Sequence, residues 1–377
     1  MTDTEALLRV LAAHLHGRPS RIPVTEGLLK DADRHEVEAI VYWQTRAREL
    51  EKAFFYDIAA DRKRRRLDRE IRETLKEAGI PCFSVKGLFV ADYYPMPALR
   101  TMGDIDYVTT DRPAVQAALE KKGYVFPKTN GVTDWHFSKS GIEFELHSRL
   151  IYDVRFGSKT QVRYINDCWR YYEDGAINVN FHFVYMVMHL RKHLLEGVGF
   201  RQFYDFAVLI KNAGDIFDWE WIRGELKKIS LLSFAEVCFG LCQKWFKVPP
   251  PFEIPALPYG FSREAAEEIG RNGVFGTDRK DLRINPNKHM NRSAKYGYLA
   301  AQGARFLQRV FPSYEEMTLY PQYGFLDGRR YLLPVAWICR FFMDFFRIDK
   351  WKKLEAETQV SRNEFEKRNL SLRKWGL

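Results

Sequence analysis

The stretch that decides the fold reads Gly103-Asp104-Ile105-Asp106-Tyr107-Val108, an alternation of acidic and apolar residues typical of a β-strand. Residues two apart on a strand project from the same face, about 6.5 to 7 Å from each other. Asp104 and Asp106 therefore point the same way, while Ile105 packs into the core behind them. Two carboxylates this close repel each other in apolar surroundings, and a divalent cation between them removes the penalty. The stretch thus predicts a strand that carries part of a metal site.

A second acidic stretch, Ile142-Glu143-Phe144-Glu145-Leu146-His147, alternates in the same way and places two glutamates and a histidine on one face. If this strand lies beside 104–108, either Glu143 or Glu145 completes a set of three carboxylates. Magnesium, or manganese in its place, prefers such oxygen ligands together with substrate phosphates. In a two-ion site, one ion lowers the pKa of an attacking hydroxyl and the other holds the phosphates of a nucleoside triphosphate.

Donors for an anion precede the acidic strand. Lys86-Gly87 follows a predicted strand over 80–85 and opens a predicted helix over 88–94. Gly87 allows the backbone to approach a phosphate, the helix N-terminus directs N–H groups at it, and Lys86 adds a charge. Arg100 is the second candidate for a phosphate clamp, and Gly103 the second glycine at which a nucleotide could approach the backbone.

A basic run, Arg62-Lys63-Arg64-Arg65-Arg66, lies within a predicted helix over 51–78. The run could contact phosphates. It is also typical of the solvated face of a long helix, because Asp61, Asp68 and Glu70 are interleaved with it. The sequence leaves both interpretations open.

Residues from about 76 to 150 form a compact α/β unit, in which a predicted helix over 113–122 separates the acidic strands. Trp135-His136-Phe137 and the 142–147 strand flank Lys139-Ser140-Gly141, a pattern that predicts a hairpin. Helical periodicity dominates elsewhere. The clearest predicted helices outside this unit cover 37–50, 51–78, 182–195, 203–211, 219–228 and 234–246. Residues 249–258 are proline-rich and predict a linker or rigid loop, and 279–295 predict a polar, basic loop.

The net charge of +10, from 59 basic and 49 acidic residues, favours an anionic partner such as a nucleotide, a nucleic acid or a membrane surface. A nucleic-acid binder would show a steep salt dependence, but the sequence contains no known nucleic-acid reading motif. The tail from Arg329 alternates bulky apolar with basic residues up to 350–353. It predicts either a helix that lies on a membrane surface or one that packs on the protein with a solvated face.

The sequence argues against membrane-spanning, secreted and zinc-binding proteins. The sequence has no apolar run of about 18 residues, which argues against a transmembrane helix. The acidic start, Met1-Thr2-Asp3-Thr4-Glu5, is unlike a secretory signal. The five cysteines are scattered, with no partner set for zinc, and suit a reducing cytoplasm as buried small residues. They are Cys82, Cys168, Cys238, Cys242 and Cys339. We therefore expect a cytoplasmic protein.

Several runs together carry a family resemblance. In chain order they are Val85-Lys86-Gly87-Leu88, Tyr94-Pro95, the run from Arg100 to Val108, the run from Gly141 to His147, the run from His193 to Asp205 and, more weakly, Phe311-Pro312-Ser313 and 334–340. These runs resemble the bacterial family of uncharacterised nucleotidyltransferases within the polymerase-β-like superfamily. That family's strand typically reads acid-Leu-His, which matches Glu145-Leu146-His147 and favours Glu145 over Glu143.

The resemblance implies an α+β fold, a small mixed β-sheet forming a nucleotidyltransferase core between N-terminal and C-terminal helical regions. The corresponding boundaries are 1–78 for the N-terminal helical region, 79–165 for the core, 166–300 for a helical domain and 301–377 for a C-terminal helical region with a basic tail. It also implies magnesium-dependent transfer of a nucleotidyl group from a triphosphate, with Asp104, Asp106 and Glu145 as catalytic metal ligands. The alternative is a nucleotide-binding regulatory or interaction protein that keeps the fold without turnover. Gly87 is followed by leucine here, where the superfamily usually has Gly-Ser or Gly-Gly.

Three further residues are candidates for the site, and two of them, His147 and Arg201, have an alternative role. His147 could contact the acceptor or orient Glu145. Arg201 and His193 could line a cleft and contact the nucleotide. Alternatively Arg201 pairs with Asp205, four residues further along a helix, and braces helix packing.

Overall fold

The computed structural model describes residues 1–127, 134–152, 158–274, 307, 310–318, 320–345 and 370–377. The chain divides into two units. The larger comprises Met1–Leu150, Arg163–Asp278 and Lys374–Leu377, and the smaller comprises Ile151–Val162 and Arg279–Arg373.

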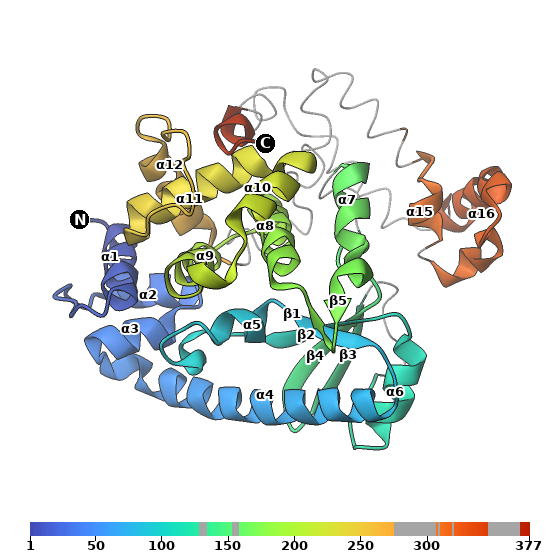
Figure 1. Ribbon diagram of the computed structural model, residues 1–377, viewed down its shortest axis with the longest axis horizontal. Coiled ribbons are helices and arrows are strands. Elements are labelled where there is room, and N and C mark those ends of the chain that lie inside the picture. Colours follow the sequence, from blue (N-terminus) through green and yellow to red (C-terminus); the bar gives the residue numbers. More distant parts are fainter. Residues whose placement is uncertain (128–133, 153–157, 275–306, 308–309, 319, 346–369) are drawn as a thin grey trace. The chain divides into compact units, whose positions relative to one another are not determined.

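The larger unit contains a four-stranded mixed sheet (Figure 1). Its strands, in spatial order, are β1 (Cys82–Val85), β2 (Asp104–Thr109), β4 (Ile142–His147) and β3 (Asp134–Lys139). β2 and β4 are parallel, and the two outer pairings are antiparallel. The predicted α+β class with a small mixed sheet is therefore confirmed.

Most apolar positions of β2 and β4 face one layer of helices. Ile105 and Phe144 are buried in a core with residues of α4 (Glu51–Glu77) and α6 (Arg112–Glu120). The long helix α4 runs along this side of the sheet and continues past its end (Figure 1). The acidic positions of β2 and β4 consequently occupy the opposite face, because neighbouring residues of a strand point to opposite sides.

Helices surround the sheet in the rest of the larger unit. They include α1 (Asp3–Leu15), α2 (Glu26–Arg34), α3 (Glu38–Thr45), α5 (Gly87–Ala91), α8 (Val179–Glu196), α9 (Phe200–Asn212), α10 (Trp219–Lys228), α11 (Leu232–Phe246) and α12 (Phe261–Asn272), with the 3-10 turns η1 (Arg48–Leu50), η2 (Pro97–Leu99), η4 (Cys168–Tyr171) and η5 (Gly214–Ile216). A short hairpin, β5 (Tyr172–Glu173) and β6 (Ala176–Ile177), precedes α8, and α7 (Lys159–Asn166) spans the boundary between the units.

Most predicted helices form with ends within a few residues. The helix predicted over 37–50 is divided, because Arg46 adopts a left-handed backbone conformation with φ of 56° and ends α3. The helix predicted over 88–94 is shorter and begins earlier, at Gly87. The hairpin β5–β6 and helix α12 were not predicted. Two residues are too short a signal to recognise as a strand, which accounts for the missed hairpin.

The smaller unit contains α15 (Tyr314–Met317), the 3-10 turns η6 (Pro321–Leu326) and η7 (Arg330–Leu332), and α16 (Leu333–Phe345). Ala336 of α16 packs in a small core with Met317, Tyr323 and Leu326. The predicted loop over 279–295 and the basic residues 350–353 lie outside the described residues. Membrane contact by the tail stays a prediction, and every helix in the described ranges is too short or too polar to span a bilayer.

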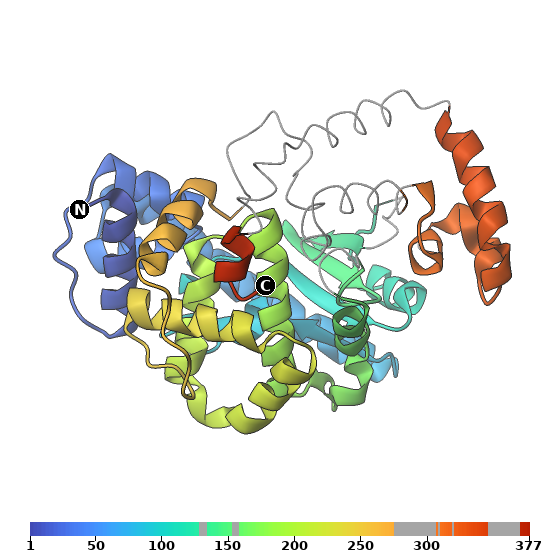
Figure 2. The same cartoon turned by 90° about the horizontal axis from the view of Figure 1, so that it is seen from above.

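The chain's last residues return to the larger unit. Trp375 is fully buried, with its ring 5.3 Å from Phe261 and 6.0 Å from Phe203 between ring centres. Lys374 pairs with Glu264 on α12. The C-terminal turn, red in Figure 2, thus packs through Trp375 against α9 and α12, which precede it by more than a hundred residues.

We expect Trp375→Ala to destabilise the larger unit by about 3 to 5 kcal/mol, because it leaves a cavity the size of an indole ring. Chemical denaturation followed by circular dichroism measures the loss. Leu370→Ala is the control, since that side chain is 60% exposed and its removal should change the stability little. Equal stabilities for the two variants would contradict the proposed role of the C-terminal turn.

Candidate metal and nucleotide site

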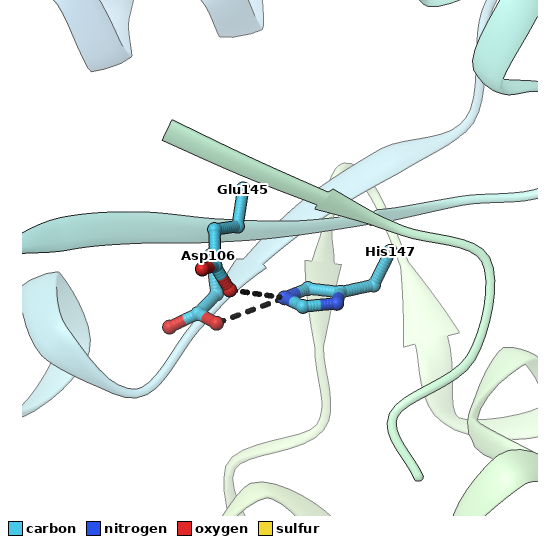
Figure 3. Close-up of side chains that lie close together, drawn as sticks. All are labelled: Asp106, Glu145 and His147. Atoms are coloured by element: carbon cyan, nitrogen blue, oxygen red, sulfur yellow. Dashed lines mark hydrogen bonds and ion pairs between the residues drawn. The ribbon is translucent and has the colours of Figure 1, made fainter. Parts of the chain in front are cut away.

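The parallel pairing of β2 with β4 sets the centre of the site. Its register places Asp106 opposite Glu145 and Asp104 opposite Glu143. One ligand atom from each of Asp106, Glu145 and His147 lies within 4.8 Å of the other two, so that a single metal ion could be held among them (Figure 3).

His147 bridges the carboxylates of this cluster. Its Nε2 lies 2.9 Å from Asp106 Oδ1 and 3.4 Å from Glu145 Oε2, and its Nδ1 lies 2.7 Å from Asp134 Oδ1 on β3. Burial opposes protonation of the ring, but the three carboxylates outweigh it and raise the pKa of His147 to about 11. The protonated ring is therefore favoured without a bound metal ion, and an ion bound through Nε2 would displace the proton from that nitrogen.

Lys86 places a second cation against the same acid. Its Nζ lies 2.6 Å from Asp106 Oδ1. Lys86 follows β1 directly and precedes α5 in a rare backbone conformation, with φ of 63° and ψ of −103°, and its backbone N–H donates to His182 Nε2 at 2.9 Å. The surroundings thus hold a strained backbone in place, as is common at functional sites.

These two cations determine the charges of the acids. Burial alone would raise the pKa of Asp106, but Lys86 and His147 together lower it well below its usual value. Asp104 is less well compensated, because the charge of Lys86 lowers its pKa by less than burial and the neighbouring acids raise it. Burial, followed by the charges of Asp106 and Glu145, raises the pKa of Asp104 to about 6. The cluster therefore carries more negative charge than the protein's cations offset, a condition that favours binding of a further cation.

Helix α8 forms a second wall of the site. His182 caps the Lys86 backbone, and further along α8 the Nε2 atoms of His189 and His193 lie 3.2 Å apart. Burial, followed by the nearby charges of Lys192, Lys86 and Arg201, lowers the pKa of His193 to about 3. This wall is consequently a cationic region that contains neutral histidines, which suits an anionic ligand.

Arg100 is placed differently from the prediction. Its Nε and Nη2 donate to the two carboxylate oxygens of Asp205, each at 2.9 Å, and Tyr94 donates its hydroxyl to the same carboxylate at 2.7 Å. All three groups are buried. A guanidinium held in a bidentate pair is not a free phosphate clamp, so Arg100 serves here to join η2 to α9.

The predicted pair of Arg201 with Asp205 was wrong. Arg201 instead contacts Glu36, with Nη2 2.7 Å from Oε2, and donates from Nη1 to the carbonyl oxygen of Thr101. Asp205 is taken by Arg100, which reaches both of its carboxylate oxygens from the segment that follows η2.

The predicted glycines have different surroundings. Gly87 is buried, and a β-carbon there would lie 3.1 Å from Met102 Sδ and 3.3 Å from Arg100 Nη1. The absence of a side chain thus allows close packing against the segment before β2. Gly103 is exposed, with open space around it. Helix α5 is only five residues long, too short for the predicted helix-terminus phosphate site.

Two residues of the site were not predicted. Asp134 pairs in register with His147 across β3 and β4, and its carboxylate fixes the imidazole. His182 is 96 positions from the Lys86 backbone that it holds. Asp134 shares one face of β3 with His136 and Ser138, and this alternation could have indicated its role. No local sequence pattern indicates the role of His182.

The fold and the acidic cluster define a nucleotidyltransferase domain. The family model of the uncharacterised nucleotidyltransferases matches residues 25–247, and the chain belongs to that family. The matched region contains the whole sheet, helix α4 and the α8 wall. Searches of the curated proteins and of the solved structures find no match to this chain.

We expect Arg100→Met to destabilise the fold by about 3 to 5 kcal/mol, because it leaves the Asp205 carboxylate buried without its cation. Tyr94→Phe removes a single hydrogen bond to the same carboxylate and should cost less, roughly 1.5 to 3 kcal/mol. Adding Asp205→Asn to Arg100→Met should recover part of the loss, since a buried amide needs no counter-charge. Urea denaturation measures all three, and a negligible effect of Arg100→Met would contradict the structural role.

Proposed function

We propose that this protein transfers a nucleoside monophosphate from a nucleoside triphosphate to a hydroxyl or phosphate group of an acceptor, with magnesium as the cofactor. The observation that carries the proposal is the convergence of Asp106, Glu145 and His147 beside Lys86, in a chain of the nucleotidyltransferase family. Nucleotidyl transfer needs acidic residues that bind a metal ion and a nearby positive charge that binds phosphate. Lys86 provides that charge in this protein.

The donor set fits a divalent ion. Asp106 and Glu145 supply oxygen ligands, and Asp104 adds a third carboxylate whose raised pKa reflects uncompensated negative charge. The protonated His147 supplies positive charge among these carboxylates. When bound, a divalent ion supplies charge neutralisation at the phosphates and a lowered pKa for the attacking hydroxyl. With manganese or a softer metal, a deprotonated His147 would offer Nε2 as a further ligand.

The chain's own residues then bind and orient the triphosphate. Lys86, directly after β1, is a fixed cation in contact with Asp106, and His193 lies on the α8 side. Arg201 adds positive charge from α9, with its guanidinium paired to Glu36. In the proposed reaction the acceptor oxygen forms a bond to the α-phosphorus, the bond from that phosphorus to the bridging oxygen breaks, and pyrophosphate leaves. His147, held by Asp134, keeps Asp106 and Glu145 together during this exchange.

We expect magnesium together with ATP, or another nucleoside triphosphate, to raise the melting temperature of the protein, because ligands that bind only the folded state stabilise it. The double variant Asp104→Ala with Asp106→Ala should lose this shift. Differential scanning fluorimetry with each of the four triphosphates, with and without magnesium, measures it. A shift of unchanged size in the double variant would contradict the site.

The two glutamates of β4 provide a matched pair for the metal site. Both side chains lie on the same face of β4, two positions apart. Glu145 belongs to the cluster with Asp106 and His147, whereas Glu143 is exposed. We expect Glu145→Gln to weaken manganese binding at least tenfold and Glu143→Gln to weaken it less than twofold. Electron paramagnetic resonance of free manganese gives both affinities, and equal effects would contradict the assignment to Glu145.

The product identifies the reaction. The protein is incubated with labelled triphosphate, magnesium and a cell extract, and the labelled product is analysed by mass spectrometry. Nucleotidyl transfer adds a nucleoside monophosphate to the acceptor, phosphoryl transfer adds only a phosphate, and a nucleotide-binding regulator without turnover gives no product.

A further inference from the structure

The basic run of α4 separates into residues that face the protein and residues that face solvent. Arg64 is buried, and Arg65 pairs with Asp61 on the same helix. Three arginines are exposed, and a half-buried lysine lies beside them. They are Arg62, Lys63, Arg66 and, three residues further on, Arg69. Residues three and four apart lie on the same side of a helix, so these four cations form one basic stripe.

The acids that are interleaved with the basic run in the sequence do not neutralise this stripe. Asp61 is buried and taken by Arg65. Asp68 is buried and accepts the hydroxyl of Tyr107. Glu70 pairs with Lys139 of β3. Within the described ranges, none of the four cations of the stripe forms an ion pair. The balance of charge in the sequence is therefore lost on the surface of the folded helix.

The stripe places like charges next to each other. Arg62 lies four residues before Arg66, and Arg69 lies three residues after it, spacings at which like charges destabilise a helix. The apolar residues Leu67 and Ile71 hold α4 in the core that it shares with the sheet, in spite of this repulsion. An anionic partner on the outer side of α4 would remove the repulsion, and the net charge of +10 would attract such a partner.

Exposed aromatic rings continue the stripe toward the start of α4. Phe55 lies about two turns before Arg62 on the same side of the helix and is 57% exposed. Trp43 of α3 is 41% exposed. Both rings contact the buried Phe54, with ring centres 5.4 Å and 6.1 Å away, and the guanidinium of Arg46 lies 4.7 Å from the centre of the Trp43 ring. The outer side of α4 thus combines a row of cations with a group of exposed rings.

We propose that this surface binds single-stranded nucleic acid. The guanidinium groups of the stripe would donate to backbone phosphates, and Phe55 and Trp43 would stack on unpaired bases, the two contacts by which single strands are bound without a sequence code. A duplex keeps its bases stacked inside and would leave both rings without a partner. A membrane surface favours apolar side chains along the helix, whereas the stripe from Arg62 to Arg69 is basic.

The surface is separate from the candidate metal site. Helix α4 packs on the face of the sheet opposite to Asp106 and Glu145, and the stripe lies on the side of α4 that is turned away from the sheet. The inference therefore does not rest on the proposed nucleotidyl transfer, and the two are tested by different ligands.

The test uses a fluorescent oligoribonucleotide of mixed sequence and about 20 nucleotides, long enough for one binding surface. Fluorescence anisotropy measures the dissociation constant for the full chain at several salt concentrations. We expect Arg62→Gln with Arg66→Gln to raise this constant about tenfold or more at low salt. The variant should also lower the slope of log affinity against log salt by about 1.4, because two phosphate contacts to a single strand are lost.

The matched control is Arg170→Gln with Arg263→Gln. It removes the same charge from two exposed arginines that are each paired with an acid outside the stripe. We expect it to change the dissociation constant less than about twofold, because an exposed arginine paired with an acid adds little to the attraction of phosphate. An equal loss of affinity in the double variant and in this control would overturn the proposal.

Phe55→Ala tests the contribution of the rings. It should weaken binding of the oligoribonucleotide about fivefold or more, because a base loses its stacking partner. Binding of a heparin oligosaccharide, which carries anionic groups without bases, should stay unchanged. If Phe55→Ala leaves the affinity for the oligoribonucleotide unchanged, the surface recognises acidic polymers in general and the proposal is wrong.

Other occupants are outcomes of the same experiment. Tighter binding of a duplex or of phosphatidylserine vesicles than of the single strand overturns the proposal, as does a wild type that does not bind the oligoribonucleotide. Should the double variant not fold, as judged by circular dichroism, Arg62→Gln and Arg66→Gln are measured singly. An unchanged dissociation constant and salt slope for both single variants then contradicts the role of the stripe.

Discussion

The structure of the site depends on one pairing, that of β2 with β4 in parallel register. This pairing places Asp106 beside Glu145 and leaves the apolar residues between them to face the helices α4 and α6. A slip of one residue in either strand would turn its acids into the core and its apolar side chains into the site, at a large cost in desolvation. The same hydrophobic pattern that buries one face of the sheet therefore fixes the position of the proposed metal ligands on the other.

Bringing these acids together requires positive charge, and the protein supplies it from two directions. Lys86 at the end of β1 and His147 at the end of β4 both contact the same oxygen of Asp106. Asp134 and His182 in turn hold these two cations, one through a side chain and the other through the backbone. The arrangement keeps the carboxylates close to each other and leaves Asp104 less well compensated. A divalent ion would complete the balance.

Two arginines show how burial separates residues that look alike in sequence. Arg100 stands four residues before Asp104, yet its guanidinium is held by Asp205 on α9 and connects the two sides of the unit. Arg64 lies in a run of basic residues on α4, yet it is buried and its Nε has no hydrogen-bond partner among the described residues. Position in the sequence is a poor guide to the partner of an arginine, because a long side chain is directed by the packing of the element that carries it.

The sequence by itself determined the strands of the four-stranded sheet, the face on which Asp104, Asp106 and Glu145 lie, and the family, because alternation along a strand and the local acid-Leu-His pattern are properties of consecutive residues. It also located most helices. Only the tertiary structure decided which partner each long polar side chain takes. The partners of His147, Lys86 and Arg100 come from positions 13 to 105 residues away. A buried charged side chain pairs with a group within hydrogen-bonding distance, and the packing of the elements in three dimensions determines which group that is.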